Sequence, residues 1–341
     1  MEDSEQKILL RRVALYSYIS GLPYLWFEKL NWSSQLIYFH KNITKIVSII
    51  NYSFLLVSFW MWPLFNQKNW NQKQIYDIIM YNLTQPFLYL SPISLTYLKT
   101  DVTQLIYELV VVAPKVHNNP DVVIEMIKKS KILLILLVTN IVASMIMIGI
   151  NCLARVIVKD EVFNTILTVW PDVEDRSQVA GAFRLITYIA WLLMIFRLSG
   201  AVVVVVCLMT YTSHQFKQLQ SYFCGLADIF HQDLTQITKE RKFEEALLVG
   251  IKFHIHMIHL TRNLVKTCNV TYGGDIVTNV ILIAIIMIRL ANEERNLTNV
   301  LASGQIAITI LAITGGYMWT LGDITIEADN LTNAMYMSGW E

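Results

Sequence analysis

Ionisable side chains inside apolar segments are the residues of this chain whose types and positions are best suited to chemistry. Arg197 lies at the centre of the apolar stretch 182–211, and Asp275 lies within a second stretch, 269–290. An arginine at the centre of a membrane helix costs about 2.5–3.5 kcal/mol on insertion scales. We therefore expect Arg197 to pair with Asp275 or with backbone carbonyls, or to reach a wet cavity that binds a polar ligand group. Arg184 lies nearer the outer interface and is expected to snorkel.

Three clustered histidines are the next candidates for chemistry. On a helix His254 and His256 point about 200° apart, so at most His256 and His259 share a face. No cysteine lies nearby, which makes metal binding an unattractive reading. The sequence also contains no G-x-S-x-G, P-loop or H-E-x-x-H motif. We expect neither an enzyme nor a resident metal or cofactor.

The elements that must position these residues are membrane helices. Hydrophobic residues make up 55% of the chain and charged residues 16%, with a mean hydropathy of +0.46, outside the range of ordinary soluble domains. Four uncharged runs reach or exceed the roughly 20 residues that cross a bilayer, and the two charge-bearing stretches above complete six. We predict an all-α polytopic membrane helical bundle, a single domain over 1–341, with spans at about 43–65, 76–98, 132–157, 182–211, 269–290 and 300–322. In the last span Gly304, Gly315 and Gly316 are expected to be helix-packing positions.

Basic residues are distributed unequally between alternating loops. The N-terminal region and the second and fourth loops carry 17 Lys and Arg, whereas the first, third and fifth loops carry 5. The positive-inside rule therefore predicts a cytoplasmic N-terminus, which argues against G-protein-coupled receptors. In the fourth loop, 212–267, helical spacing of Leu248, Ile251, Ile255 and Ile258 predicts a cytoplasmic helix that packs on another helix or another subunit. The net charge of +1 implies no attraction to nucleic acid.

The C-terminal run is the most specific motif. It follows an apolar segment, lacks Lys and Arg, and contains Leu321-Gly322-Asp323, Glu327-Ala328, Leu331, Ala334-Met335-Tyr336 and Trp340. This run closely resembles the stretch before the final membrane helix of insect odorant receptors, particularly those of moths and butterflies. Ile251-Lys252-Phe253-His254 gives a weaker match to the helix that leads to their fifth span. The acids Asp323, Glu327 and Asp329 are expected to be solvated, with attraction of cations to an inner pore mouth as the alternative.

The resemblance implies a function and an architecture. A family member is an odour-tuning subunit of a ligand-gated, non-selective cation channel, assembled as a heterotetramer with an obligate co-receptor in the plasma membrane of olfactory sensory neurons. A seventh helix lines the pore in that family, so the resemblance implies that this sequence is truncated. Without that helix it is expected neither to conduct nor to make the central subunit contacts, and odour-evoked current is expected only when the helix is restored and a co-receptor supplied. A gustatory receptor-like subunit is the second reading. A secondary transporter is the alternative from another class, but it predicts inverted repeats, which the sequence does not contain.

The resemblance also implies where a volatile ligand would bind. In the family the odorant occupies the outer half of a cavity between spans two, three, four and six. Such a ligand offers few hydrogen bonds, so apolar and aromatic walls must select it by shape and dispersion. The residues that map to this depth are Tyr81, Met145, Ile148, Asn151, Tyr188, Trp191, Met194, Gln305 and Thr309. The bland alternative for each is contact with lipid or a packed neighbour.

Overall fold

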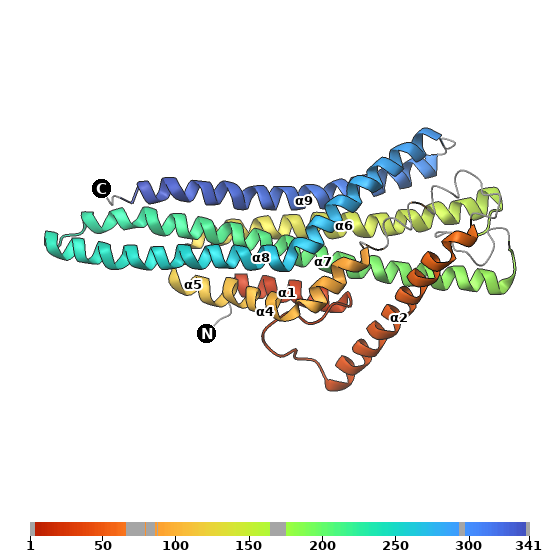
Figure 1. Ribbon diagram of the computed structural model, residues 1–341, viewed down its shortest axis with the longest axis horizontal. Coiled ribbons are helices and arrows are strands. Elements are labelled where there is room, and N and C mark those ends of the chain that lie inside the picture. Colours follow the sequence, from red (N-terminus) through yellow and green to blue (C-terminus); the bar gives the residue numbers. More distant parts are fainter. Residues whose placement is uncertain are drawn as a thin grey trace.

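Long helices lying side by side form the body of the molecule (Figure 1). The structure is a computed structural model that describes residues 4–65, 79, 86, 88–163, 175–292 and 297–338. Within these residues there is no strand, so the all-α fold class is confirmed. The C-terminal ends of α6 (Pro120–Lys159) and α8 (Gln236–Asn292) lie toward one end of the bundle, and the turn between α7 (Gln178–Leu226) and α8 forms the opposite end (Figure 1).

Four helices carry most of the chain. They are α6 (Pro120–Lys159, 40 residues), α7 (Gln178–Leu226, 49), α8 (Gln236–Asn292, 57) and α9 (Leu297–Tyr336, 40). All four are long and apolar enough to cross a membrane, judged on the described residues. At 1.5 Å per residue α8 is about 85 Å long, nearly three times the roughly 30 Å hydrocarbon core. These helices must therefore project well beyond the membrane.

The first two predicted spans are only partly covered by the described residues. The first, 43–65, falls within α2 (Ser34–Phe65), which crosses beside α7 at an angle to the long helices (Figure 1). The second, 76–98, is described at 79, 86 and 88–98, which include a helical segment at 88–97. The count of six spans therefore stays a prediction.

The C-terminal half of α7 is the axis of the bundle. Every side chain from 198 to 216 is buried, including five consecutive valines at 202–206. Valine is a poor helix former because its branched Cβ restricts χ1 against the preceding turn. Burial on all sides compensates for this, since α1, α6, α8 and α9 all pack on α7. Such complete burial is typical of a central helix.

The N-terminal helix α1 (Glu5–Ile19) docks on this axis at a close approach. A Cβ added at Gly200 would lie 2.0 Å from Oγ of Ser20, so only glycine leaves room there. The hydroxyls of Tyr16 and Ser199 hydrogen-bond at 2.8 Å beside this contact. An N-terminal helix that the sequence places outside the spans is thus an integral part of the core.

The glycines predicted to pack in the last span behave differently. Cβ atoms added at Gly304 or Gly315 would meet no described atom within 4 Å, and at Gly316 the nearest would be a Leu137 methyl at 3.7 Å. The expected close packing at Gly304 and Gly315 is therefore wrong within the described residues. Glycine at Gly200 is required instead, where a second helix backbone approaches.

Short helical turns connect the long elements on the side of α1. They are α4 (Lys99–Tyr107), the π-helical turn η1 (Glu108–Val112) and α5 (Ala113–Val116). A 3-10 turn, η2 (Ala227–His231), joins α7 to α8 at the end of the bundle. His117, directly after α5, packs edge-on against Tyr222 of α7 at a ring-centroid distance of 5.5 Å. Its burial lowers the pKa of the imidazole. The second loop is thus folded onto α7.

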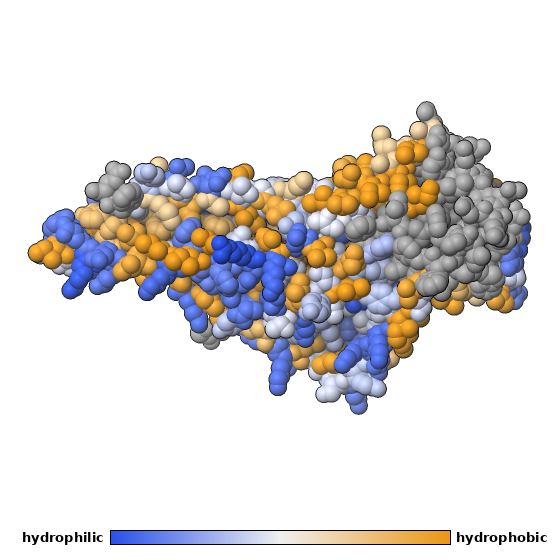
Figure 2. Space-filling model, viewed as in Figure 1, coloured by the Kyte–Doolittle hydropathy of each residue, from blue (hydrophilic) through white to orange (hydrophobic). Residues whose placement is uncertain are grey.

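The predicted helical loop 212–267 forms the end of α7, the η2 turn and the first half of α8. The apolar face expected to pack within or between chains is exposed here: Leu248 and Ile255 are 51% and 61% accessible. A different face of α8, containing Phe253 and Met257, packs into the core. Figure 2 accordingly shows apolar and charged side chains mixed over this hairpin, and apolar ones gathered on the outer part of α8.

Of the three tail acids, Asp329 is exposed as expected, whereas Asp323 and Glu327 are paired. Asp323 forms an ion pair with Lys129 of α6. Lys217 of α7 lies 2.6 Å from Glu125 of α6 and 3.6 Å from Glu327 of α9. These pairs join three helices on the side of the α7–α8 hairpin. The motif residues of α9 therefore have structural partners that lie far away in sequence.

Candidate functional site

Two predicted site residues of α9 meet α6 in a polar contact. The hydroxyls of Ser144 and Thr309 lie 2.6 Å apart, and the Thr309 hydroxyl also donates to the Asn140 carbonyl at 3.0 Å. The Gln305 carbonyl, 3.3 Å from the Ser144 hydroxyl, is an alternative acceptor for its proton. Thr309 and Ser144 are 7% and 9% exposed. Their hydroxyls are already satisfied, so a ligand here would be held mainly by its shape.

The next turns of α6 carry the other three predicted residues of that helix. Met145, Ile148 and Asn151 are all half-buried. Ser144 is the residue in this region that sequence reasoning missed as a member of the site. The sequence shows a serine next to the predicted residue Met145, but it does not show that this serine contacts Thr309 of α9.

Of the three predicted residues on α7, Tyr188 faces α6. The Tyr188 ring packs edge-on against Phe163 at 5.6 Å, and its hydroxyl lies 2.6 Å from where a Cβ on Gly149 would be. Met194 is buried at 3% exposure, and Trp191 is half-buried. Tyr188 thus fills the space above Gly149 between the two helices. Tyr81, the ninth predicted residue, lies outside the described residues, and the pocket as a whole stays a prediction.

The two intramembrane charges do not pair with each other. Nη1 of Arg197 donates to the Ser48 hydroxyl of α2 at 2.7 Å. Asp275 accepts from the Ser91 hydroxyl at 3.1 Å and from the Tyr317 hydroxyl at 2.8 Å. The expected pair is therefore wrong, because each charge is held by hydroxyl groups of other helices.

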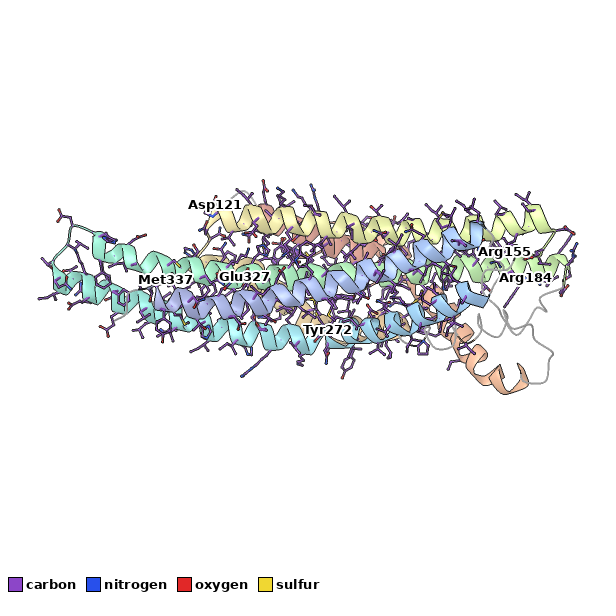
Figure 3. All side chains as sticks on the ribbon, turned by 90° about the horizontal axis from the view of Figure 1, so that it is seen from above. Asp121, Arg155, Arg184, Tyr272, Glu327 and Met337 are labelled. Carbon is purple, nitrogen blue, oxygen red and sulfur yellow. The ribbon has the colours of Figure 1, made fainter. Side chains whose placement is uncertain are left out.

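Arg184 lies near the start of α7 and is held by the preceding chain. It is 5% exposed, and its Nη1 donates to the Asp175 carbonyl at 2.9 Å. Figure 3 places it toward the end of the bundle away from Met337. The guanidinium therefore binds the chain just before α7, and its expected place at the membrane interface stays a prediction.

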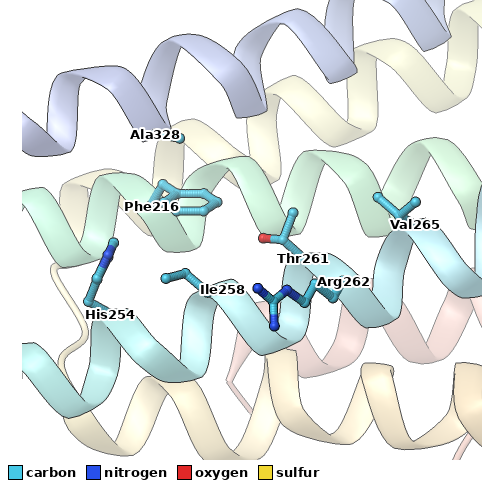
Figure 4. Close-up of a pocket in the computed structure, with 7 residues that line it drawn as sticks. All are labelled: Phe216, His254, Ile258, Thr261, Arg262, Val265 and Ala328. Atoms are coloured by element: carbon cyan, nitrogen blue, oxygen red, sulfur yellow. The ribbon is translucent and has the colours of Figure 1, made fainter.

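A cavity of about 410 Å³ lies away from these residues, between α7, α8 and α9 on the side of the α7–α8 hairpin. Figure 4 shows Phe216 of α7 facing Ile258, Thr261 and Arg262 of α8, with Ala328 of α9 above them. His254 and Val265 complete its lining. The cavity contains none of the nine predicted residues, and its α8 wall belongs to the helix that precedes the fifth predicted span.

Comparisons with known proteins bear on this arrangement at the level of the fold. No family model and no curated protein sequence matches the chain. Two solved structures of the insect olfactory receptor OR5 from Machilis hrabei do match. The first has a TM-score of 0.75 at 14% sequence identity and covers 96% of this chain and 82% of the receptor. This chain has the olfactory-receptor fold.

The second of these olfactory-receptor structures was solved in complex with eugenol. It matches with a TM-score of 0.76 at 15% identity, over 96% of this chain and 83% of the receptor. The shared fold therefore covers nearly all of this chain. Identity this low carries the arrangement of helices and not the residues of a binding site.

Proposed function

We propose that this protein is an odorant-receptor subunit that binds a small, mostly apolar volatile between its membrane helices. The observation that carries the proposal is the match of 96% of the chain to an olfactory-receptor fold. Fold alone does not define function, so the α9 motif adds independent support. That motif resembles the moth and butterfly receptors, which is the subgroup we assign.

The chemistry of the outer helical halves supports an apolar ligand. Tyr188, Trp191 and Met194 of α7 supply aromatic and thioether surface, and Met145 and Ile148 of α6 supply flexible apolar surface. The hydroxyls nearby are already hydrogen-bonded within the protein. A ligand with few hydrogen-bonding groups therefore loses least on entering this site.

The arrangement of basic segments supports a cytoplasmic N-terminus. The helix α1, the second loop and the α7–α8 hairpin all pack around the inner half of α7. For example, the Tyr211 hydroxyl of α7 donates to the Gln6 carbonyl of α1 at 2.9 Å. These are the segments that carry the excess of Lys and Arg, so the charge rule and the packing favour the same orientation.

We further propose that the subunit acts in the plasma membrane of olfactory neurons, in a heterotetramer with an odorant co-receptor that forms a non-selective cation channel. The test is co-expression in oocytes of such a co-receptor with this chain extended by the seventh helix that the resemblance implies, followed by voltage clamp under a panel of volatiles. We expect inward currents that require both subunits. Surface expression of both without any odour-evoked current across a broad panel would contradict the proposed function.

A further inference from the structure

A buried carboxylate links three helices in the membrane-embedded part of the bundle. Asp275 of α8 is 5% exposed, and its two oxygens accept hydrogen bonds from Ser91 in the segment 88–97 and from Tyr317 of α9. Both donors are fully enclosed, at 1% and 0% exposure. Tyr272, labelled in Figure 3, lies one turn before Asp275 on α8. We call Ser91, Asp275 and Tyr317 the membrane cluster.

The membrane cluster is held by neutral donors alone. Among the described residues Asp275 forms no ion pair, and the cation at mid-span, Arg197, is bound to Ser48. A carboxyl group at membrane depth is costly unless its oxygens are satisfied. Separating Tyr317 or Ser91 from Asp275 would leave a buried oxygen without a partner. The cluster therefore favours one relative position of the three helices.

The depths of the three residues agree with one another. Ser91 lies seven residues from the inner end of its predicted span, Asp275 six from the start of its span, and Tyr317 five from the end of its span. At 1.5 Å per residue each is about 8–10 Å inside the inner boundary. Three spans counted independently thus place the cluster in one layer of the inner leaflet.

Helix α9 connects this layer to the proposed odorant site. Tyr317 lies eight residues, about 12 Å, from Thr309, which contacts α6 in the outer half. Between them Thr314 accepts a hydrogen bond from Asn279 of α8 at 3.0 Å. A continuous helix transmits a displacement along its length. A ligand that moves α9 near Thr309 must therefore strain the bond between Tyr317 and Asp275.

We propose that the membrane cluster is a gating latch: its hydrogen bonds hold the segment 88–97, α8 and α9 in the closed arrangement, and ligand-driven movement of α9 releases Tyr317 from Asp275. The proposal rests on the proposed receptor function. Asp275 acts here as a positioning residue and does not touch the ligand. Weakening the latch favours the open state regardless of which ligand opens it, because the bias lies in the protein.

The test compares Tyr317→Phe with Tyr272→Phe in the same extended chain, co-expressed with a co-receptor. Both changes remove one phenolic oxygen, but only Tyr317 donates to Asp275. We expect Tyr317→Phe to raise the current without odorant and to lower the half-maximal concentration of two chemically unrelated odorants by the same factor. That factor is about 3–18, which corresponds to the roughly 0.6–1.7 kcal/mol of interhelical hydrogen bonds in membranes. Tyr272→Phe should match the wild type.

Two further variants keep the test decisive. Ser91→Ala breaks the other bond and should shift both odorants in the same direction, which protects against failure of a single variant to fold. Adding Asp275→Asn to Tyr317→Phe should give less than the sum of the two separate shifts. Unchanged responses of both Tyr317→Phe and Ser91→Ala at wild-type surface levels would overturn the latch. So would a shift confined to one odorant, whereas a silent wild type would instead refute the proposed function.

Discussion

Replacing Gly200 by alanine tests the docking of α1 on the axis of the bundle. The added Cβ would lie 2.0 Å from Oγ and 3.1 Å from Cβ of Ser20, and 3.3 Å from the backbone Cα of Ser17. Overpacking of this kind costs about 1–3 kcal/mol. Alanine recovers about 0.5–1 kcal/mol of helix propensity. Because one clashing atom belongs to the α1 backbone, we expect a net loss of about 1–2 kcal/mol in the free energy of unfolding.

The assay is thermal unfolding of a fluorescent fusion in detergent, followed by size-exclusion chromatography. By the scaling of soluble domains to a chain of 341 residues, the expected loss lowers Tm by about 1–3 °C. Gly304→Ala and Gly315→Ala are the matched controls, since a Cβ there would meet no described atom within 4 Å. They should equal or exceed the wild type. A Gly200→Ala protein as stable as these controls would refute the close approach of α1 to α7.

Three further outcomes are expected. Thr309→Val removes the hydroxyl that joins Ser144 and the Asn140 carbonyl, and should cost about 0.6–1.7 kcal/mol of thermal stability in detergent; an unchanged Tm would show that this contact contributes nothing. Lys217→Met removes both ion pairs to Glu125 and Glu327 and should lower stability by up to about 1 kcal/mol at low salt, a difference that salt reduces; a salt-independent difference would contradict an electrostatic origin. Burial lowers the pKa of His117, so the unfolded chain protonates first, and stability complete above about pH 6.5 is lost as pH falls toward the folded pKa. His117→Gln should flatten unfolding curves measured from pH 7 to 5, and a retained slope would assign the pH dependence to other groups.

The long helices were predictable from the sequence because a bilayer imposes a minimum length on uncharged runs. The run between Lys131 and Arg155 corresponds to the apolar part of α6, and the run before Asp323 to that of α9. No such constraint acts outside the lipid. The continuation of α8 over 57 residues and the docking of α1 depend on contacts that local sequence does not encode.

Partners distant in sequence account for the errors. Asp323 reads as a solvated acid because Lys129 lies 194 positions away. Arg197 and Asp275 are complementary in charge, but the fold places each beside hydroxyl groups of a different helix. The exposed apolar face of α8 shows the same limit: helical spacing identified an apolar stripe at Leu248 and Ile255, but α8 has a second one, and the fold buries that one.

The most direct test of the account is where a volatile ligand binds. A volatile that evokes current and carries a small photoreactive diazirine should be irradiated with the protein in membranes, and the labelled peptides identified by mass spectrometry. We expect adducts on the outer parts of α6, α7 and α9, around Met145, Tyr188 and Thr309, that an excess of unlabelled odorant abolishes. Adducts confined to the cavity around Phe216 and His254, or labelling that no odorant displaces, would contradict an odorant site between the membrane helices.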